Sequence, residues 1–294
     1  MRFFILPTVA AVLVSSGALA APIQLPGIGG VASEHHPGKI IWADLVTPDM
    51  ASAERFYSGM FGWTFKSVQG VGIDYAVAMS GGQPVAGIVQ KPLPADEHRQ
   101  PAWLTFIAVR DVDAAERIAL GSGAKMMSKA KTYAGRGRQA VFADPDGAVF
   151  AVLASSHGDT ADVLATPGEW IWSSLLAEDP EREATFYQSV FGYDLFDLPR
   201  DDGASHVILS SDDYARASVN PLPSGGHRRP HWIDFIRVLS ADDAAAKAVS
   251  LGGKVLVPPY SDRHGDKVAV VADPAGAPLG VMEWSESESK AEPK

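Results

Sequence analysis

The chain contains no cysteine among its 294 residues, so it has no disulfide bond, no thiolate metal ligand and no thiol nucleophile. Positive charge is also scarce, with 25 Lys and Arg against 35 Asp and Glu and a formal net charge of −10. An acidic chain is a poor partner for nucleic acid or for an anionic membrane surface. The remaining composition, 46% hydrophobic and 20% charged, is typical of a globular protein.

A long apolar run is present only at the start of the chain. Arg2 precedes an almost wholly apolar stretch, and Ala18-Leu19-Ala20 is a small-x-small cleavage pattern. The run is shorter than the ~20 residues that a membrane span needs. We therefore expect residues 1–20 to be a secretory signal, with an uncleaved anchor helix as the alternative. The product is expected to be periplasmic or secreted, with no membrane attachment after cleavage.

An internal repeat organises the rest of the chain. Trp42, Phe56-Tyr57 and Phe61-Gly62 recur 130 residues later, and this offset is held within one residue as far as Gly276. Such a repeat predicts two homologous domains, in agreement with the length. The expected segments are a flexible Gly- and Pro-rich arm at 21–38, a first domain at 39–155, a linker at 156–168, a second domain at 169–285 and a disordered tail at 286–294.

Each domain divides once more into two similar halves. Residues 40–47 have the apolar, β-branched pattern of a strand, and Pro48-Asp49 begins a helix that Gly62 ends. Three short strands follow, separated by Gly-containing turns. A weaker repeat at an offset of 62 residues predicts the same order in the second half. The expected fold class is therefore α+β, with four βαβββ units.

The repeated Phe-Tyr and Phe-Gly pairs, together with Asp-Pro-x-Gly turns at Asp144 and Asp273, resemble the vicinal oxygen chelate superfamily. This superfamily includes glyoxalase I, bleomycin-resistance proteins and extradiol dioxygenases. The resemblance covers residues 39–285 and implies that the units pair into two cupped, incomplete β-barrel domains with helices on the outside. The ligand would lie in the cup. Pairing of units between two chains, as a homodimer, is the alternative.

The resemblance also implies a divalent metal, held early on the first strand of a unit and on the last strand. The corresponding residues here are Trp42, Ala151, Trp172 and Gly280. Their side chains offer no ligand to a metal ion, so we expect no metal cofactor. The alternative is a metal-dependent lyase or dioxygenase with an atypical site in the second domain. Its candidate ligands are His206, His231 and His264.

Each unit opens with a tryptophan followed two residues later by a polar residue. The four pairs are Trp42 and Asp44, Trp103 and Thr105, Trp172 and Ser174, and Trp232 and Asp234. Residues two apart on a strand share a face, so these pairs predict an apolar cup with a few hydrogen-bonding groups for a small molecule. The alternative is that the tryptophans belong to the core. Alignment of the units by their helices shifts the second strand by one residue and turns Trp103 to the other face.

Tyr133, Arg136 and Arg138 are further candidates, as contacts to an anionic group of a ligand. No motif identifies a catalytic residue. The sequence predicts an exported, metal-free protein that binds a small organic molecule in aromatic-lined cups, for sequestration or sensing. An interaction protein whose cups are filled by side chains is the third hypothesis.

Overall fold

The computed structural model describes residues 24–28, 34–69, 73–92, 100–197, 206–223, 229–261 and 265–284. The expected signal at 1–20, the expected tail at 286–294 and His264 lie outside the described residues. Within these ranges, no helix has the length and apolar character needed to cross a membrane.

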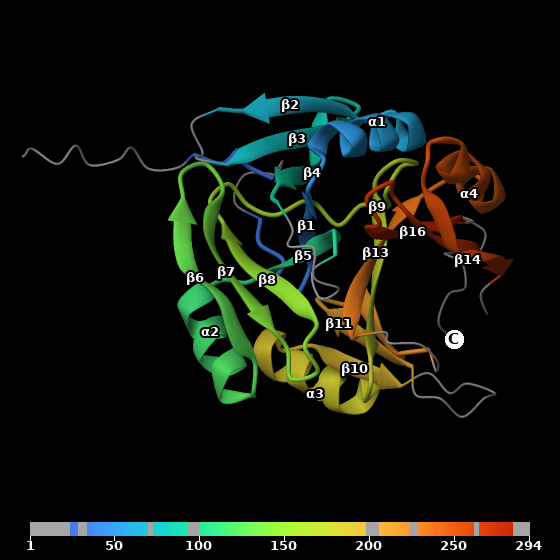
Figure 1. The fold of residues 1–294 in the computed structure, drawn as a ribbon. Coiled ribbons are helices and arrows are strands. Elements are labelled where there is room, and N and C mark those ends of the chain that lie inside the picture. Colours follow the sequence, from blue (N-terminus) through green and yellow to red (C-terminus); the bar gives the residue numbers. More distant parts are fainter. Residues whose placement is uncertain are drawn as a thin grey trace, which may run out of the picture.

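The first domain is a single eight-stranded sheet with two helices (Figure 1). Its first unit comprises β1 (Ile40–Thr47), α1 (Met50–Phe61), β2 (Thr64–Val68), β3 (Asp74–Ser80) and β4 (Gln83–Gln90). Its second unit comprises β5 (Ala102–Ala108), α2 (Val112–Gly121), β6 (Lys125–Tyr133), β7 (Gly137–Ala143) and β8 (Val149–Ser155). The strand order is β2-β3-β4-β1-β5-β8-β7-β6, so the sheet ends at β2 and β6 without closing into a barrel.

The second domain repeats this arrangement, with the strand order β10-β11-β12-β9-β13-β16-β15-β14. Its first unit comprises β9 (Trp170–Ala177), α3 (Pro180–Phe191), β10 (Asp194–Asp197), β11 (Val207–Ser211) and β12 (Tyr214–Pro221). Its second unit comprises β13 (His231–Arg237), α4 (Ala241–Ser250), β14 (Lys254–Ser261), β15 (Lys267–Ala272) and β16 (Pro278–Met282). The predicted α+β class and βαβββ units are therefore confirmed, and consecutive units pair within the chain.

The helix boundaries follow from local chemistry that the sequence shows. The Asp49 side chain accepts a hydrogen bond from the Ser52 backbone N–H at the start of α1, and Gly62 ends the helix with a φ of 73°. In α3, Asp179 accepts from the Arg182 N–H in the same way, and Gly192 has a φ of 75°. Caps and glycines at equivalent positions thus give both domains the same helix.

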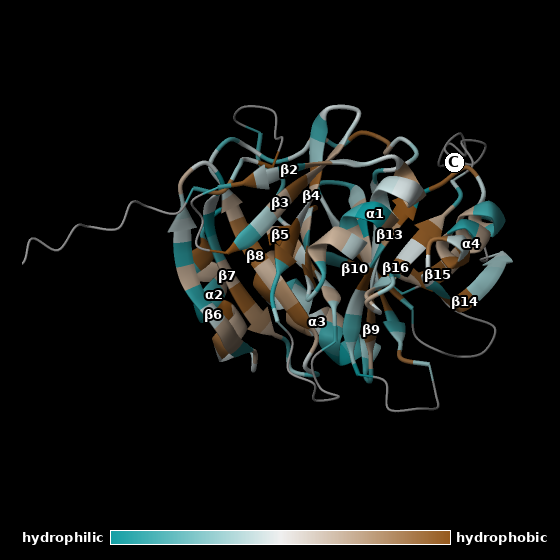
Figure 2. Ribbon diagram, turned by 45° about the horizontal axis from the view of Figure 1, so that its top comes forward, coloured by the Kyte–Doolittle hydropathy of each residue, from teal (hydrophilic) through white to brown (hydrophobic). Residues whose placement is uncertain are grey.

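The helix-bearing faces of the two sheets pack against each other and form the centre of the molecule. Helix α1 contacts α4, and α2 contacts α3, across the domain boundary. At the two ends of this interface, Trp103 Nε1 donates to Tyr57 Oη at 3.1 Å and Trp232 Nε1 donates to Tyr187 Oη at 3.0 Å. Figure 2 shows hydrophobic residues along central strands such as β8 and β13. The helices thus lie outside the cups but between the domains.

Each sheet also has a face that carries no helix. We call this surface face one in the first domain and face two in the second. Figure 1 shows the first sheet bending between β2–β4 and β6–β8. These two faces correspond to the predicted cups, and the candidate site is described on them.

Candidate functional site

The four predicted Trp-polar pairs are divided between opposite faces of the sheets. Trp42 pairs with Phe106 across β1 and β5, whereas Trp103 pairs with Leu45, whose side chain lies in the interdomain core. Because directly paired residues share a face, Trp42 lies on face one and Trp103 on the helix-bearing side. The second domain repeats this division. Trp42, Asp44, Trp172 and Ser174 therefore occupy the helix-free faces, whereas Trp103, Thr105, Trp232 and Asp234 lie on the helix-bearing side.

Asp234 lies instead in a polar contact between the domains. Its carboxylate accepts hydrogen bonds from Thr105 Oγ1 at 2.8 Å and from Ser173 Oγ at 2.6 Å. Burial raises the pKa of Asp234 to about 6, and these two hydrogen bonds oppose the shift. Thr105 and Asp234 thus join β5 to β13 and lie away from both helix-free faces.

Face one carries a buried charged cluster around Asp44. Asp44 Oδ1 accepts from Trp42 Nε1 at 2.7 Å and from Tyr75 Oη at 2.8 Å. Arg136 donates to Tyr75 Oη at 2.7 Å and lies 3.5 Å from Asp44 Oδ2. The Arg136 guanidinium also lies over the Trp42 ring, 4.8 Å from its centroid, and its side chain is completely buried. The hydrogen-bonding groups of this face are therefore occupied by one another.

Residues 24–28, which we call the strap, cover this cluster. Leu25 and Ile28 are 6% and 2% exposed and belong to the same buried cluster as Trp42 and Tyr75. The Leu25 N–H donates to Ala134 O at 3.0 Å, and Arg136 Nε donates to Pro26 O at 3.2 Å. This part of the expected flexible arm is therefore packed onto face one, which it fills.

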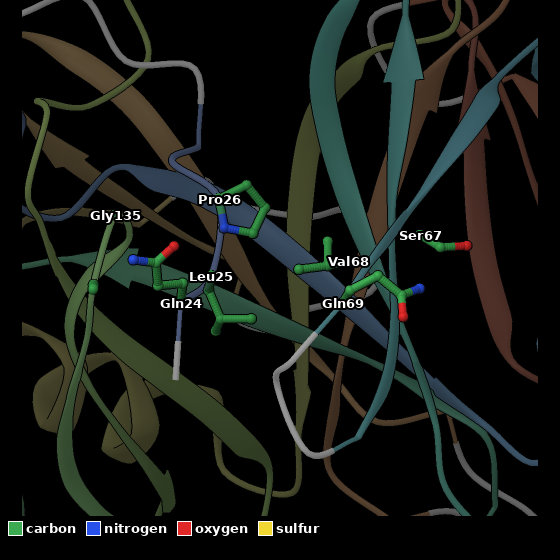
Figure 3. Close-up of a pocket in the computed structure, with 8 residues that line it drawn as sticks. Gln24, Leu25, Pro26, Ser67, Val68, Gln69 and Gly135 are labelled. Carbon is green, nitrogen blue, oxygen red and sulfur yellow. The ribbon is translucent and has the colours of Figure 1, made fainter. Parts of the chain in front are cut away.

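A groove lies beside the strap, between β2 and the turn that joins β6 to β7 (Figure 3). It has a volume of about 530 Å³. Its lining residues are Gln24, Leu25, Pro26, Ser67, Val68, Gln69, Ala134 and Gly135. This lining offers no ionised side chain and only the Gln and Ser side chains and backbone groups for hydrogen bonding. The groove contains none of the residues predicted to contact a ligand.

The other two candidates near Asp144 differ in position. Tyr133 is half-buried and packs against the apolar cluster of face one. Arg138 points toward the helix-bearing side and forms an ion pair with Asp113 of α2, with 2.6 Å between Nη2 and Oδ1. The expected group of Tyr133, Arg136 and Arg138 is therefore not assembled around one ligand position.

Face two is polar at its centre and is not covered by an equivalent of the strap among the described residues. Trp172 Nε1 donates to Ser218 Oγ at 3.1 Å, and Ser218 Oγ donates to Ser174 Oγ at 3.2 Å. Asn220 Nδ2 donates to Ser174 Oγ at 2.5 Å and to Ser218 Oγ at 3.0 Å. The Asn220 Oδ1 atom is hydrogen-bonded to His206 Nδ1. Trp172, Asn220 and His206 are all partly accessible, so the network is open to solvent.

Aromatic side chains flank this network on the edge strands of the sheet. Phe196 of β10 pairs with Ile208, which pairs in turn with Ser218, so all three lie on face two. Tyr260 of β14 pairs with Val268 and reaches the same face from the opposite edge. Phe196 is 55% exposed and Tyr260 is 53% exposed. Sequence reasoning missed both residues, because the short segments that contain them show no alternation that assigns either ring to a face.

The positions that the resemblance assigns to a metal do not fit one in this structure. Ala151 lies beside Phe106, and Gly280 lies beside Phe235. A Cβ atom at position 280 would approach Phe235 Cδ1 to 2.2 Å, so the phenylalanine ring occupies the space into which a ligating side chain would project. Across the described ranges, no three His, Asp or Glu side chains are grouped as metal ligands. His206 and His231 therefore belong to no such group within those ranges, and His264 lies outside them.

Comparison with known proteins accounts for this architecture. Residues 39–152 match the Glyoxalase/Bleomycin resistance protein/Dioxygenase superfamily, and residues 173–282 match a Glyoxalase-like domain. The Mycobacterium tuberculosis protein CFP32, which carries the name of a glyoxylase, is 32% identical over 85% of this chain and 96% of its own length. The Streptomyces peucetius anthracycline biosynthesis protein DnrV is 32% identical over 85% of this chain and 94% of its own length.

Solved structures share the fold at low sequence identity. The Mn(II)-bound glyoxalase from Novosphingobium aromaticivorans has a TM-score of 0.59 and 18% identity, over 85% of this chain and 83% of that chain. An extradiol ring-cleaving dioxygenase from B. fuscum has a TM-score of 0.62 and 14% identity, over 87% of this chain and 74% of that chain. The relatives and the matches in both halves agree with the paired βαβββ units. The chain therefore belongs to the glyoxalase, bleomycin resistance protein and dioxygenase superfamily, as a two-domain member.

Proposed function

We propose that this protein binds a small organic molecule on face two without a metal ion. The first domain then has a structural role, because the strap covers face one. The observation that carries the proposal is the contrast between the faces. Trp42 is 2% exposed beneath the strap, whereas its counterpart Trp172 is partly accessible and joined to a polar network. Apolar surface with a few convergent hydrogen-bonding groups is the usual composition of a small-molecule site.

The names of two relatives support an organic ligand. Both are named for anthracycline biosynthesis, and an anthracycline contains fused aromatic rings. The exposed rings of Phe196 and Tyr260 are suited to packing against such a molecule. Export of the protein, which residues 1–20 indicate, belongs to this proposal and is compatible with sequestration or sensing of a compound outside the cytoplasm.

A ligand panel with and without a chelator tests the proposal. Thermal unfolding would be followed with aromatic compounds of different charge and size, in the presence and absence of EDTA. We expect at least one compound to raise the unfolding temperature in a saturable way, and EDTA to leave this shift unchanged. The double variant Phe196→Ala, Tyr260→Ala should lose the shift, because it removes both exposed rings of face two.

Met127→Ala is the matched control. Met127 is 58% exposed on β6, an edge strand of the other domain, so its truncation should leave the shift intact. A shift that EDTA abolishes and a divalent ion restores would overturn the metal-free proposal. Absence of any shift across the panel would overturn small-molecule binding and favour the interaction role.

A further inference from the structure

The two helix-free faces carry different chemistry at equivalent positions of the internal repeat. The offsets are 129 to 131 residues, and the strand pairings agree, since Asp44 faces Gly87 across β1 and β4 as Ser174 faces Ser218 across β9 and β12. The six pairs, with face one first, are Asp44 and Ser174, Lys66 and Phe196, Tyr75 and His206, Gly87 and Ser218, Lys131 and Tyr260, and Arg136 and Gly265.

Face two has lost every carboxylate, ammonium and guanidinium group at these six positions. Asp44 is replaced by a hydroxyl, and both lysines are replaced by aromatic rings. Gly265 stands where Arg136 closes face one, and a Cβ atom added there would meet nothing within 4 Å. A charged ligand on face two would lose part of its hydration without gaining a counter-charge at these six positions, which disfavours its binding. Arg237, which the strand pairing places on the same face, donates to the backbone oxygens of Ala165 and Trp284.

The hydrogen bonds of the face-two network all point from donors toward Ser174. Trp172, Asn220 and Ser218 all donate within the network, and Ser174 Oγ accepts from two of them. A hydroxyl has one donor and two acceptor sites. Among the described residues, no acceptor takes the Ser174 proton. The network thus ends on one hydroxyl donor, which suits an acceptor oxygen on a ligand.

We propose that face two selects flat, uncharged aromatic ketones or quinones. The carbonyl oxygen of the ligand accepts the Ser174 hydroxyl proton, and its rings pack against Trp172 and Phe196. This inference rests on the function proposed above and adds the chemical class of the ligand. The absence of cysteine from the chain means that a quinone bound here meets no protein thiol with which to form an adduct.

Three probes with one skeleton test the class. Fluorenone is flat and uncharged with one carbonyl, fluorene lacks the carbonyl, and fluorenone carboxylate adds a negative charge. Affinities would be measured by quenching of tryptophan fluorescence in the full-length protein. We expect fluorenone to bind about ten-fold more tightly than fluorene, as one net hydrogen bond predicts. Fluorenone carboxylate should bind at least about ten-fold more weakly than fluorenone.

Substitutions test which residues cause the affinity differences among the three probes. Ser174→Ala should remove the advantage of fluorenone over fluorene and leave the affinity for fluorene unchanged. Phe196→Lys with Tyr260→Lys restores the residue type of face one, so it should weaken binding of fluorenone through loss of both rings and reverse the preference for fluorenone over its carboxylate. Lys66→Phe makes the reverse change on the closed face and should alter no affinity. Circular dichroism of each variant would establish that it is folded.

The outcomes separate the class of ligand from the function itself. Tighter binding of the carboxylate than of fluorenone, or an unchanged fluorenone advantage in Ser174→Ala, would overturn the proposed class. If the three probes fail but another compound of the panel binds in a way that depends on Phe196 and Tyr260, the class is again overturned and the function stands. Failure of every compound overturns both.

Discussion

At the scale of single residues, one position along a strand decides whether a tryptophan belongs to a ligand site or to the core. All four units carry the same Trp-x-polar pattern, but Trp42 lies seven residues before the helix cap Asp49 and Trp103 lies eight before the cap Asp111. A shift of one residue exchanges the faces of a strand. The Trp-x-polar pattern is the same in all four units, and only the distance from the tryptophan to the helix cap distinguishes Trp103 from Trp42.

The polar partners could not be predicted for a different reason. Tyr75 reaches Asp44 only because Gly87 lies beneath both side chains. Strand β4 enters the sheet beside β1 through a parallel pairing, which brings together residues far apart in the chain. No local pattern in the sequence shows that a glycine is required where two distant strands come together. The contact of Ser218 with Ser174 on face two also depends on a parallel pairing of distant strands and has no local pattern.

Substitution of Gly87 tests how closely the face-one cluster is packed. A Cβ atom at this position would lie 2.0 Å from Asp44 Oδ1 and 2.1 Å from Tyr75 Oη. Gly87→Ala should therefore displace both groups and lower the free energy of unfolding by about 1–3 kcal/mol. Urea denaturation would measure the change. Gly121→Ala is the control, because a Cβ atom there meets nothing within 4 Å, and it should be neutral or slightly stabilising.

At the scale of elements, the sequence predicted the helices and strands well and the strap poorly. Regular elements repeat a periodic pattern, and each of the four units could support the assignment of the others. The strap has no period, and its glycines and prolines indicate a loop. Its two buried side chains, Leu25 and Ile28, are isolated apolar residues whose burial depends entirely on face one. Packing of this kind, against a distant part of the fold, cannot be predicted from the local sequence.

Truncation of the strap side chains should therefore destabilise the first domain. Leu25→Ala and Ile28→Ala each remove a buried side chain from the cluster around Trp42 and should each lower the free energy of unfolding by about 2–5 kcal/mol. Ile73→Ala, at a position 52% exposed, should change it by less than about 0.5 kcal/mol. Guanidinium denaturation of the three variants gives the comparison. If all three have equal stability, the strap is not held on face one in solution.

At the scale of the whole molecule, the internal repeat predicted two domains but not how they pack. The Phe-Tyr pairs of α1 and α3 lie in clusters of buried side chains to which both domains contribute. The two ends of the interface are nearly equivalent, since Tyr57 donates to Asp273 at 3.4 Å and Tyr187 donates to Asp144 at 3.1 Å. The hydrophobic face of a helix can be buried equally well against its own sheet or against a second domain. Periodicity therefore predicts that the face is buried but not which surface buries it.

The buried carboxyl group at the centre of this interface makes stability depend on pH. The pKa of Asp234 is raised by burial from an ordinary value of 3.8 to about 6 in the folded protein. Because the folded state then binds this proton more tightly than the unfolded state, the contribution to stability is complete below about pH 4. It is lost as the pH rises toward 6. The loss amounts to about 3 kcal/mol, at roughly 1.4 kcal/mol per pKa unit.

Comparison of Asp234→Asn with the unmodified protein isolates this effect from other titrating groups. The amide cannot ionise and still accepts a hydrogen bond from Thr105 or Ser173, so its stability relative to the unmodified protein should rise by about 3 kcal/mol between pH 4 and pH 7. Urea denaturation at intervals across this range measures the difference. Asp197→Asn, on the exposed end of β10, removes the same charge away from the interface. If both variants follow the unmodified protein in parallel, Asp234 ionises as readily in the folded interface as in the unfolded chain, and the domain contact does not sense pH.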